Sequence, residues 1–306
     1  MSTDDLIVLV VSLGTVAIAY GLAYWVFRAH QDRSAKVGLY LLFGIPGALL
    51  VVFGAAYAVN GRDWGWTALA VGAGLCLPLL PSFRRLYARW TPMNAKSPVD
   101  MSGLCVVLAI IGFLFVSYVV NPEPVEAGGD ASISAFLVQF IAEIAFAFIL
   151  VGFTITRSFR EAIARLGLVR PTVRTVIIAL GMVIVGLIVV AFSGVMTTMF
   201  QPDVSRDISR ITEELTSDVQ NPIGAVLFGL GAGAGEELLL RGAVQPRFGL
   251  LTTSILFGLL HNQYGVSFVL LGIFSIGLLL GLERKYFGTT AAIITHAVFN
   301  TIVVLI

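Results

Sequence analysis

The sequence contains few charged residues for its length. Only 12% of its 306 residues are Asp, Glu, Lys or Arg, whereas ordinary soluble domains carry about 25%. Hydrophobic residues make up 58% of the chain, and the mean hydropathy is +0.94. This composition excludes a water-soluble globule and predicts an integral membrane protein.

The chain is also poor in cysteine and in excess charge of either sign. Its two cysteines, Cys76 and Cys105, both lie within apolar runs. They therefore support neither a disulfide framework nor a thiolate metal site. The formal net charge is +1, and proteins that bind nucleic acid usually carry a strong basic excess. We therefore expect no nucleic-acid partner.

Long apolar runs dominate the rest of the sequence. A helix needs about 20 apolar residues to cross a bilayer, and ten runs approach this length: 6–27, 37–59, 64–81, 101–120, 133–153, 174–199, 222–240, 250–262, 264–282 and 288–306. We expect an all-α polytopic membrane bundle with about eight to ten transmembrane helices. The eighth run is too short to span alone, which predicts a helix that ends within the membrane beside protein or a wet cavity.

Basic and acidic loops alternate along the chain. Lys and Arg gather after the first, third, fifth, seventh and ninth runs, whereas the loop after the fourth run contains Glu123, Glu126 and Asp130. Because cytoplasmic loops carry the excess of Lys and Arg, the pattern predicts a multi-pass protein with both termini outside. We expect the plasma (inner) membrane of a prokaryote, with the amphipathic segment 158–170 on its cytoplasmic surface.

Two adjacent carboxylates and an arginine interrupt the seventh run. Ionisable groups are costly in the bilayer core, so Glu236, Glu237 and Arg241 predict a functional site. Glu237 and Arg241 are four residues apart and can neutralise one another along one helix face, whereas Glu236 points about 100° away. Glu236 therefore needs a partner from elsewhere in the chain.

Later segments supply that partner. The helix rise of about 1.5 Å per residue places Glu236, His261 and His296 at similar depths of about 12–18 Å, with Asn300 one turn beyond His296. An acid that accepts a proton from water, with donors for the resulting oxyanion, indicates hydrolysis. Glu236, His261 and His296 could also bind zinc, but the chain lacks a His-Glu-x-x-His signature. We favour a site without metal or other cofactor and keep zinc as the alternative.

Three motifs then follow in order: Glu-Glu-x-x-x-Arg at Glu236, Phe-x-x-x-His at Phe257 and His-x-x-x-Asn at His296. Together they resemble the CPBP family of intramembrane proteases, which includes the Rce1-type CAAX prenyl endopeptidases and bacterial relatives linked to bacteriocin processing and immunity. The motif core covers 222–306, and the resemblance extends to a protease region of 133–306. Residues 1–120 match no family and are expected to form transmembrane helices of unknown role.

The resemblance implies a peptidase that hydrolyses a membrane-associated peptide or protein substrate. It assigns water activation to Glu236 with His261 and the oxyanion site to His296 and Asn300. Glu237 and Arg241 would orient and neutralise, and Phe257 would pack. Two alternatives use the same residues: an ion- or proton-coupled transporter with a buried Glu and His relay, and a noncatalytic immunity or scaffold protein of the same fold.

One further acid, Glu143, lies in the fifth apolar run beside Gln139 and outside every motif. We interpret Glu143 as a structural residue bonded to a neighbouring helix.

Overall fold

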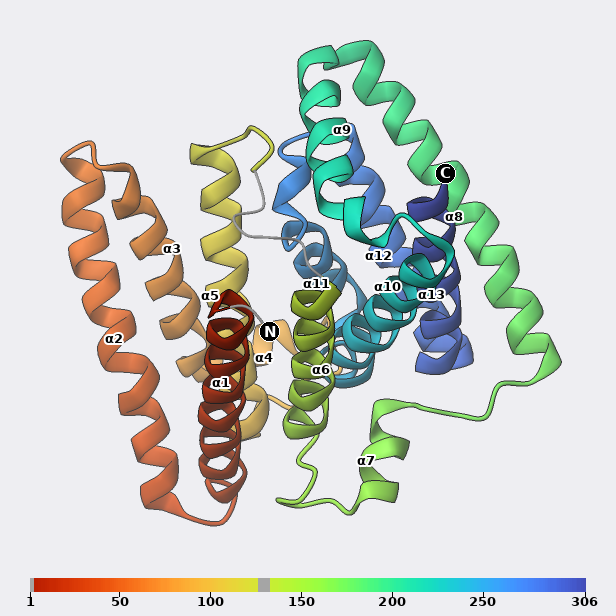
Figure 1. The fold of residues 1–306 in the computed structure, drawn as a ribbon. Coiled ribbons are helices and arrows are strands. Elements are labelled where there is room, and N and C mark those ends of the chain that lie inside the picture. Colours follow the sequence, from red (N-terminus) through yellow and green to blue (C-terminus); the bar gives the residue numbers. More distant parts are fainter. Residues whose placement is uncertain (1–2, 126–132) are drawn as a thin grey trace.

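The computed structural model describes residues 3–125 and 133–306, and the regular structure within these ranges is helical (Figure 1). The expected all-α membrane bundle is thereby confirmed. The acidic loop residues Glu126 and Asp130 lie outside the described ranges.

The amino-terminal helices pack beside one another on one side of the bundle (Figure 1). Their bounds are α1 Thr3–Arg28, α2 Arg33–Val59, α3 Asp63–Cys76, η1 Leu77–Leu79, α4 Pro81–Tyr87 and α5 Pro98–Val120. The Asp32 side chain caps α2 by accepting hydrogen bonds from the backbone N–H groups of Ser34 and Ala35. Glycine allows α2 and α3 to approach closely, because a Cβ at Gly54 or Gly65 would meet backbone atoms of the opposite helix.

The remaining elements form the other side of the bundle. Their bounds are α6 Ile133–Leu150, α7 Phe159–Leu166, α8 Val173–Phe200, α9 Pro202–Thr216, η2 Ser217–Val219, α10 Pro222–Glu236, η3 Glu237–Val244, α11 Gln245–Leu259, η4 Asn262–Tyr264, α12 Phe268–Phe287 and α13 Thr289–Leu305. Helix α10 packs against α6 and α13, while α8 packs against α12 and α13. The chain therefore surrounds α10 and α13 with other helices.

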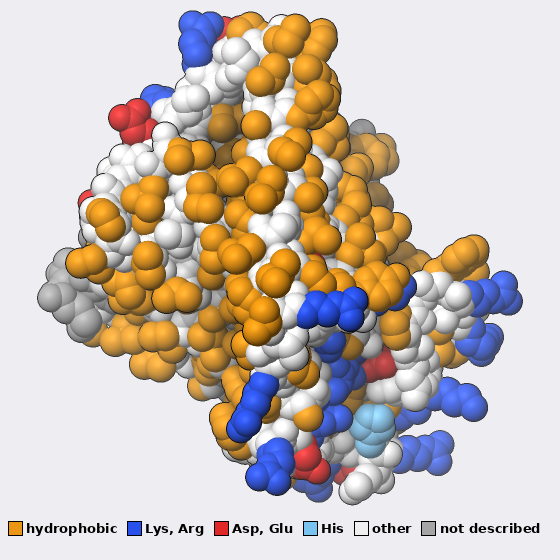
Figure 2. All heavy atoms as spheres, turned by 90° about the vertical axis from the view of Figure 1, so that its right-hand side faces the viewer, with side chains coloured by type: hydrophobic (Ala, Val, Ile, Leu, Met, Phe, Trp, Pro, Cys, Tyr) orange, Lys and Arg blue, Asp and Glu red, His pale blue; other side chains and the backbone are white. Residues whose placement is uncertain are grey.

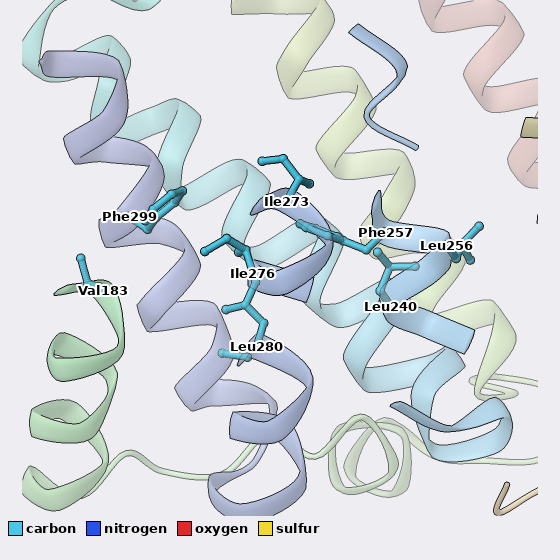
Figure 3. Close-up of a cluster of buried hydrophobic side chains, with 9 residues drawn as sticks. Val183, Leu240, Leu256, Phe257, Ile273, Ile276, Leu280 and Phe299 are labelled. Carbon is cyan, nitrogen blue, oxygen red and sulfur yellow. The ribbon is translucent and has the colours of Figure 1, made fainter. Parts of the chain in front are cut away.

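A buried apolar cluster joins the helices of this second group (Figure 3). It contains side chains from α8, η3, α11, α12 and α13: Val183, Leu240, Leu256, Phe257, Ile273, Ile276, Leu280, Ala292 and Phe299. In a bilayer, such a cluster stabilises helix association through van der Waals packing rather than through transfer from water. The cluster fixes η3 and α11 against α12, beside the predicted site.

Polar contacts connect the two groups of helices. The Tyr87 hydroxyl at the end of α4 donates a hydrogen bond to the Phe248 carbonyl at 3.1 Å and lies 2.6 Å from the Thr252 hydroxyl. Arg247 of α11 forms an ion pair with Asp100 of α5. Helix α11 therefore makes contacts with α4 and α5 as well as with α12.

Five described helices are long and apolar enough to cross a membrane: Leu9–Arg28, Arg33–Val59, Pro98–Val120, Val173–Phe200 and Pro222–Leu259. A sixth span results if Asp63–Leu79 and Pro81–Tyr87, bent by 90°, count as one. Hydropathy alone indicated more spans because it also counted the shorter apolar helices Phe136–Leu150 and Thr289–Leu305. It also separated 222–240 from 250–262, which the structure joins into one helical stretch with non-helical backbone at Gly249.

Segments outside the apolar helices differ in part from expectation. The predicted amphipathic segment contains α7, where Ser158 and Glu161 form a capping box and Gly167 ends the helix at φ 74°. Hydrogen bonds from the Ser158 side chain and backbone lower the pKa of the Glu161 carboxyl. Helix α9 lies outside the ten predicted apolar runs, and Ile208 and Ile211 provide it with a buried face.

The outer surface matches a membrane environment. In Figure 2 hydrophobic side chains cover the broad face shown, and Lys and Arg side chains gather toward its lower end. Long apolar side chains of α8, including Ile177, Ile184 and Phe192, are more than 60% exposed. An exposed apolar band of this extent belongs in lipid rather than in water.

Candidate active site

Helix α10 lies between α6 and α13 because glycines face both neighbours. A Cβ at Gly233 would lie 2.8 Å from the backbone nitrogen of Ala297 on α13. On the side facing α6, a Cβ at Gly235 would lie 2.5 Å from Oε2 of Glu143. Glycines at both positions therefore allow three helix backbones to approach at the depth of Glu236.

The first motif lies where α10 changes its helical pitch. Helix α10 ends at Glu236, and Glu237–Val244 form the π-helix η3. Wider π turns are rare and frequently occur at functional sites. Within η3, both Glu237 and Arg241 have fully buried side chains. Glu237 and Arg241 of this motif therefore lie inside the bundle.

Glu237 contacts two partners through its two carboxylate oxygens. Oε1 lies 2.9 Å from Nδ1 of His296 on α13, and Oε2 lies 3.3 Å from Nε of Arg241. The Arg241 contact has the distance of an ion pair but not the alignment of a hydrogen bond. Removing one member of a buried pair leaves an uncompensated charge, at a cost of about 3–5 kcal/mol. Glu237 therefore neutralises Arg241 and orients His296.

Arg241 is held by two further contacts. Its Nη2 donates a hydrogen bond to the Gly277 carbonyl of α12 at 3.2 Å, and its guanidinium carbon lies 4.5 Å from the centre of the Phe257 ring. Such cation–π contacts stabilise by about 2 kcal/mol when desolvated. Phe257 thus packs against the charged pair, as well as contributing to the apolar cluster.

His261 lies in the turn that follows α11. Its Nδ1 is 2.7 Å from the Phe257 carbonyl oxygen, and because a carbonyl only accepts, Nδ1 carries the proton of this hydrogen bond. In the neutral ring, Nε2 is then the basic nitrogen. The same reasoning applies to His296, whose Nδ1 donates to the Glu237 carboxylate. Both imidazoles therefore leave Nε2 available.

Both imidazoles contact the Phe257 ring. The ring centres are 4.7 Å apart for Phe257 and His261, and 5.9 Å apart for Phe257 and His296. Glu236 at the end of α10 is half-buried and interacts electrostatically with both histidines. The structure thus brings together Glu236, His261 and His296 from three different segments.

Asn300 follows His296 by one turn of α13 and is half-buried. Its side chain makes no hydrogen bond with residues in the described ranges. Asn300 therefore shares the helix of His296 without being tied to the other predicted site residues.

Glu143 was interpreted from the sequence as a structural residue outside the site. It interacts electrostatically with Glu236 and His296. Its Oε1 accepts a hydrogen bond from Gln139 Nε2 at 3.0 Å, while Oε2 is buried without a partner among the described residues. The sequence did offer one signal for Glu143, because an ionisable residue in an apolar helix is costly and often functional. No spacing rule, however, connected α6 to the three motifs.

The expected zinc alternative requires three donors that converge. Among residues 3–125 and 133–306, no group of three His, Cys, Asp or Glu side chains has a metal-binding arrangement. Both histidines of the site use Nδ1 for protein oxygens. These contacts leave Nε2 of each ring unused, and a zinc-binding histidine also donates its other ring N–H to a protein oxygen, so zinc stays the alternative to the site without metal.

Comparison with known proteins agrees with the motifs. Residues 218–302 match the family model described as type II CAAX prenyl endopeptidase Rce1-like. This region is Rce1-like. The match confirms the predicted resemblance, and the Rce1-like region contains the seven predicted residues Glu236, Glu237, Arg241, Phe257, His261, His296 and Asn300. Neither the curated proteins nor the solved structures gave a match.

The Rce1-like region covers less than a third of the chain. It begins in η2 and ends within α13, so α6 with Glu143 lies outside it. The family places the carboxy-terminal part of this membrane protein among endopeptidase-like sequences, while α1–α5 have no assigned role.

Proposed function

We propose that the protein is an intramembrane endopeptidase in which Glu236 and His261 activate water for hydrolysis of a peptide bond. The observation that carries the proposal is the difference between the two adjacent acids. Glu237 is fully buried and has its two oxygens beside His296 and Arg241. Glu236 is only half-buried and interacts with both imidazoles. Glu236 is therefore the acid that is free to accept a proton.

The reaction needs one base, one water and an oxyanion site. Glu236 accepts a proton from water while the water oxygen bonds to the peptide carbonyl carbon, and His261 Nε2 orients the water. The carbonyl oxygen becomes an oxyanion, which His296 and Asn300 stabilise. The proton held by Glu236 then passes to the leaving nitrogen as the C–N bond breaks. The products are an amine and a carboxylic acid, which then ionises by losing its proton to solvent, and Glu236 returns to its starting state.

Glu236, Glu237 and Arg241 lie within the candidate membrane span Pro222–Leu259, which suits a membrane-associated peptide or protein as substrate. We place the basic loops on the cytoplasmic side, with both termini outside, in the inner membrane of a prokaryote.

The test compares the parent chain with Glu236→Gln after purification in detergent. The substrates are two internally quenched peptides that end in Cys-aliphatic-aliphatic-X, one farnesylated and one not. We expect Glu236→Gln to lower kcat by about 100-fold or more, because an amide cannot act as the base. Glu213→Gln, an exposed acid on α9, is the matched control and should cleave like the parent.

A second measurement covers substrates that differ from these peptides. Membranes from cells that express the parent chain or Glu236→Gln are compared by mass spectrometry of new amino termini. Cleavage products that depend on Glu236 support the proposal. Equal cleavage by both chains, or the absence of any parent-dependent product in either assay, contradicts it and favours a noncatalytic protein.

A further inference from the structure

Glu143 reaches the site through a close contact between α6 and α10. Phe140 of α6 lies over Gly231, and one turn further along, Glu143 lies over Gly235. A Cβ at either glycine would overlap these side chains. The spacing of four residues between the glycines matches one helical face, so the two contacts belong to a single packed interface. Glu143 is therefore held beside the residue that precedes Glu236.

The two oxygens of Glu143 have different surroundings. Oε1 accepts a hydrogen bond from Gln139 Nε2 at 3.0 Å, whereas Oε2 is buried, faces Gly235 and has no partner among the described residues. A buried carboxylate oxygen without a donor is costly. Protonation lowers this cost because a neutral carboxyl loses less on burial than a carboxylate, while Oε1 remains an acceptor and Oε2–H becomes a donor on the side facing Gly235.

The charges around Glu143 favour the same state. Glu236 of α10 and His296 of α13 are the groups that interact with it electrostatically. On η3, Glu237 and Arg241 form their own pair. On the other two helices that pack against α6, Arg28 at the end of α1 pairs with Asp32, and Arg165 of α7 interacts electrostatically with other arginines and with Asp100 rather than with Glu143. Two neighbouring carboxyls in a poorly solvated site do not both ionise readily.

We propose that Glu143 is a positioning residue that keeps a proton and directs its Oε2–H toward the Glu236 side of the site, so that Glu236 stays ionised as the base. This inference rests on the proposed hydrolytic function for its effect on activity. The protonation of Glu143 itself is independent of catalysis. Glu143 holds its proton throughout the cycle, while the proton taken from water moves through Glu236 alone.

Two substitutions separate this role from simple packing. Glu143→Gln keeps the volume, the acceptor and a donor in place of Oε2–H, so we expect kcat within about threefold of the parent. Glu143→Leu keeps a similar volume but has no donor, so we expect kcat to fall about tenfold or more with little change in KM. If Glu143 acts only through its negative charge, Glu143→Gln should lose as much activity as Glu143→Leu.

A spectroscopic measurement tests the protonation without any substrate. Infrared spectra of the purified parent chain at neutral pH should contain the C=O stretch of a protonated carboxyl. Glu143→Gln should remove that band and Glu236→Gln should retain it. Glu283 is also a buried acid with one unpaired oxygen, so Glu283→Gln is the matched variant that assigns any overlapping band. The Glu143 band is the component that persists in Glu283→Gln and disappears in Glu143→Gln.

The two readouts distinguish the possible failures. If no variant or parent chain cleaves any substrate but the band assigned to Glu143 is present, the proposed function fails and the protonation stands. If the band is unchanged in Glu143→Gln, or Glu143→Leu cleaves like the parent, the inference about Glu143 is wrong. A folded Glu143→Leu chain, verified by circular dichroism, is required for the activity comparison, and Glu143→Gln provides the infrared test if Glu143→Leu does not fold.

Discussion

Adding one methyl group at Gly233 should disturb the site through the contact between α10 and α13. In Gly233→Ala the new Cβ would lie 2.8 Å from the Ala297 nitrogen and 2.9 Å from its Cβ, whereas ordinary contact begins at 3.4 Å. The two helices must therefore separate locally by about 0.6 Å. Ala297 follows His296 directly, so the shift moves the imidazole away from Glu237.

The contact distances give the expected loss of stability and the expected loss of activity in Gly233→Ala. Overpacking of this kind costs about 1–3 kcal/mol in the free energy of unfolding. A displacement of about 0.6 Å away from Glu237 would lengthen the 2.9 Å contact between His296 and Glu237 to about 3.5 Å, beyond a normal N–H···O hydrogen bond. Misplacement of a catalytic group by about 1 Å can cost up to a hundredfold in rate, so we expect kcat to fall between about tenfold and a hundredfold.

The matched control is Gly181→Ala on α8, where a Cβ meets no atom within 4 Å. Alanine favours a helix over glycine by about 1 kcal/mol, so this variant should unfold at the same denaturant concentration or later. Unfolding in detergent is followed by circular dichroism, because the four tryptophans lie within the first 90 residues and report on α1–α5. Equal stability and equal kcat for Gly233→Ala and the parent would refute the packing argument.

Two further predictions concern topology and metal. Cysteines introduced at Arg160 and Ser217, in a chain with Cys76 and Cys105 replaced by alanine, should react with an impermeant thiol reagent from opposite sides of the membrane; reaction of both from one side would contradict the proposed topology. Activity of the purified chain should survive stringent chelation of metal ions, whereas loss on chelation, recovery with zinc and about one metal per chain by elemental analysis would show a zinc enzyme instead.

The membrane character and the family followed from the sequence because both depend on local patterns. Apolar runs identify helices that face lipid, and motif spacing places Glu237 and Arg241 on one helix face. Their ion pair in the structure has this i, i+4 separation. His261 was also expected near the end of a short helix, and it lies just after α11.

Other features depended on contacts that no spacing rule describes. The π-helix η3 keeps the sequence pattern of an ordinary helix but changes which side chains face α13, so the contact of Glu237 rather than Glu236 with His296 was not predictable. Helix α9 was not predicted because its acidic sequence is not an apolar run. Glu143 was interpreted as structural because it lies outside the motifs, and only the glycine face of α10 brings it to the site.

The positions of four acids in the bundle support a functional site more strongly than any single motif does. Glu143, Glu236, Glu237 and Glu283 come from α6, α10, η3 and α12, yet all four have a partner in or beside one short stretch of α13. Glu237 binds His296, Glu283 accepts a hydrogen bond from Thr295 at 2.8 Å, and Glu143 and Glu236 interact electrostatically with His296. Acids retained only for packing would have no reason to converge, since each is costly in an apolar bundle. Their convergence on α13 is the arrangement that the proposed activation of water by Glu236 requires.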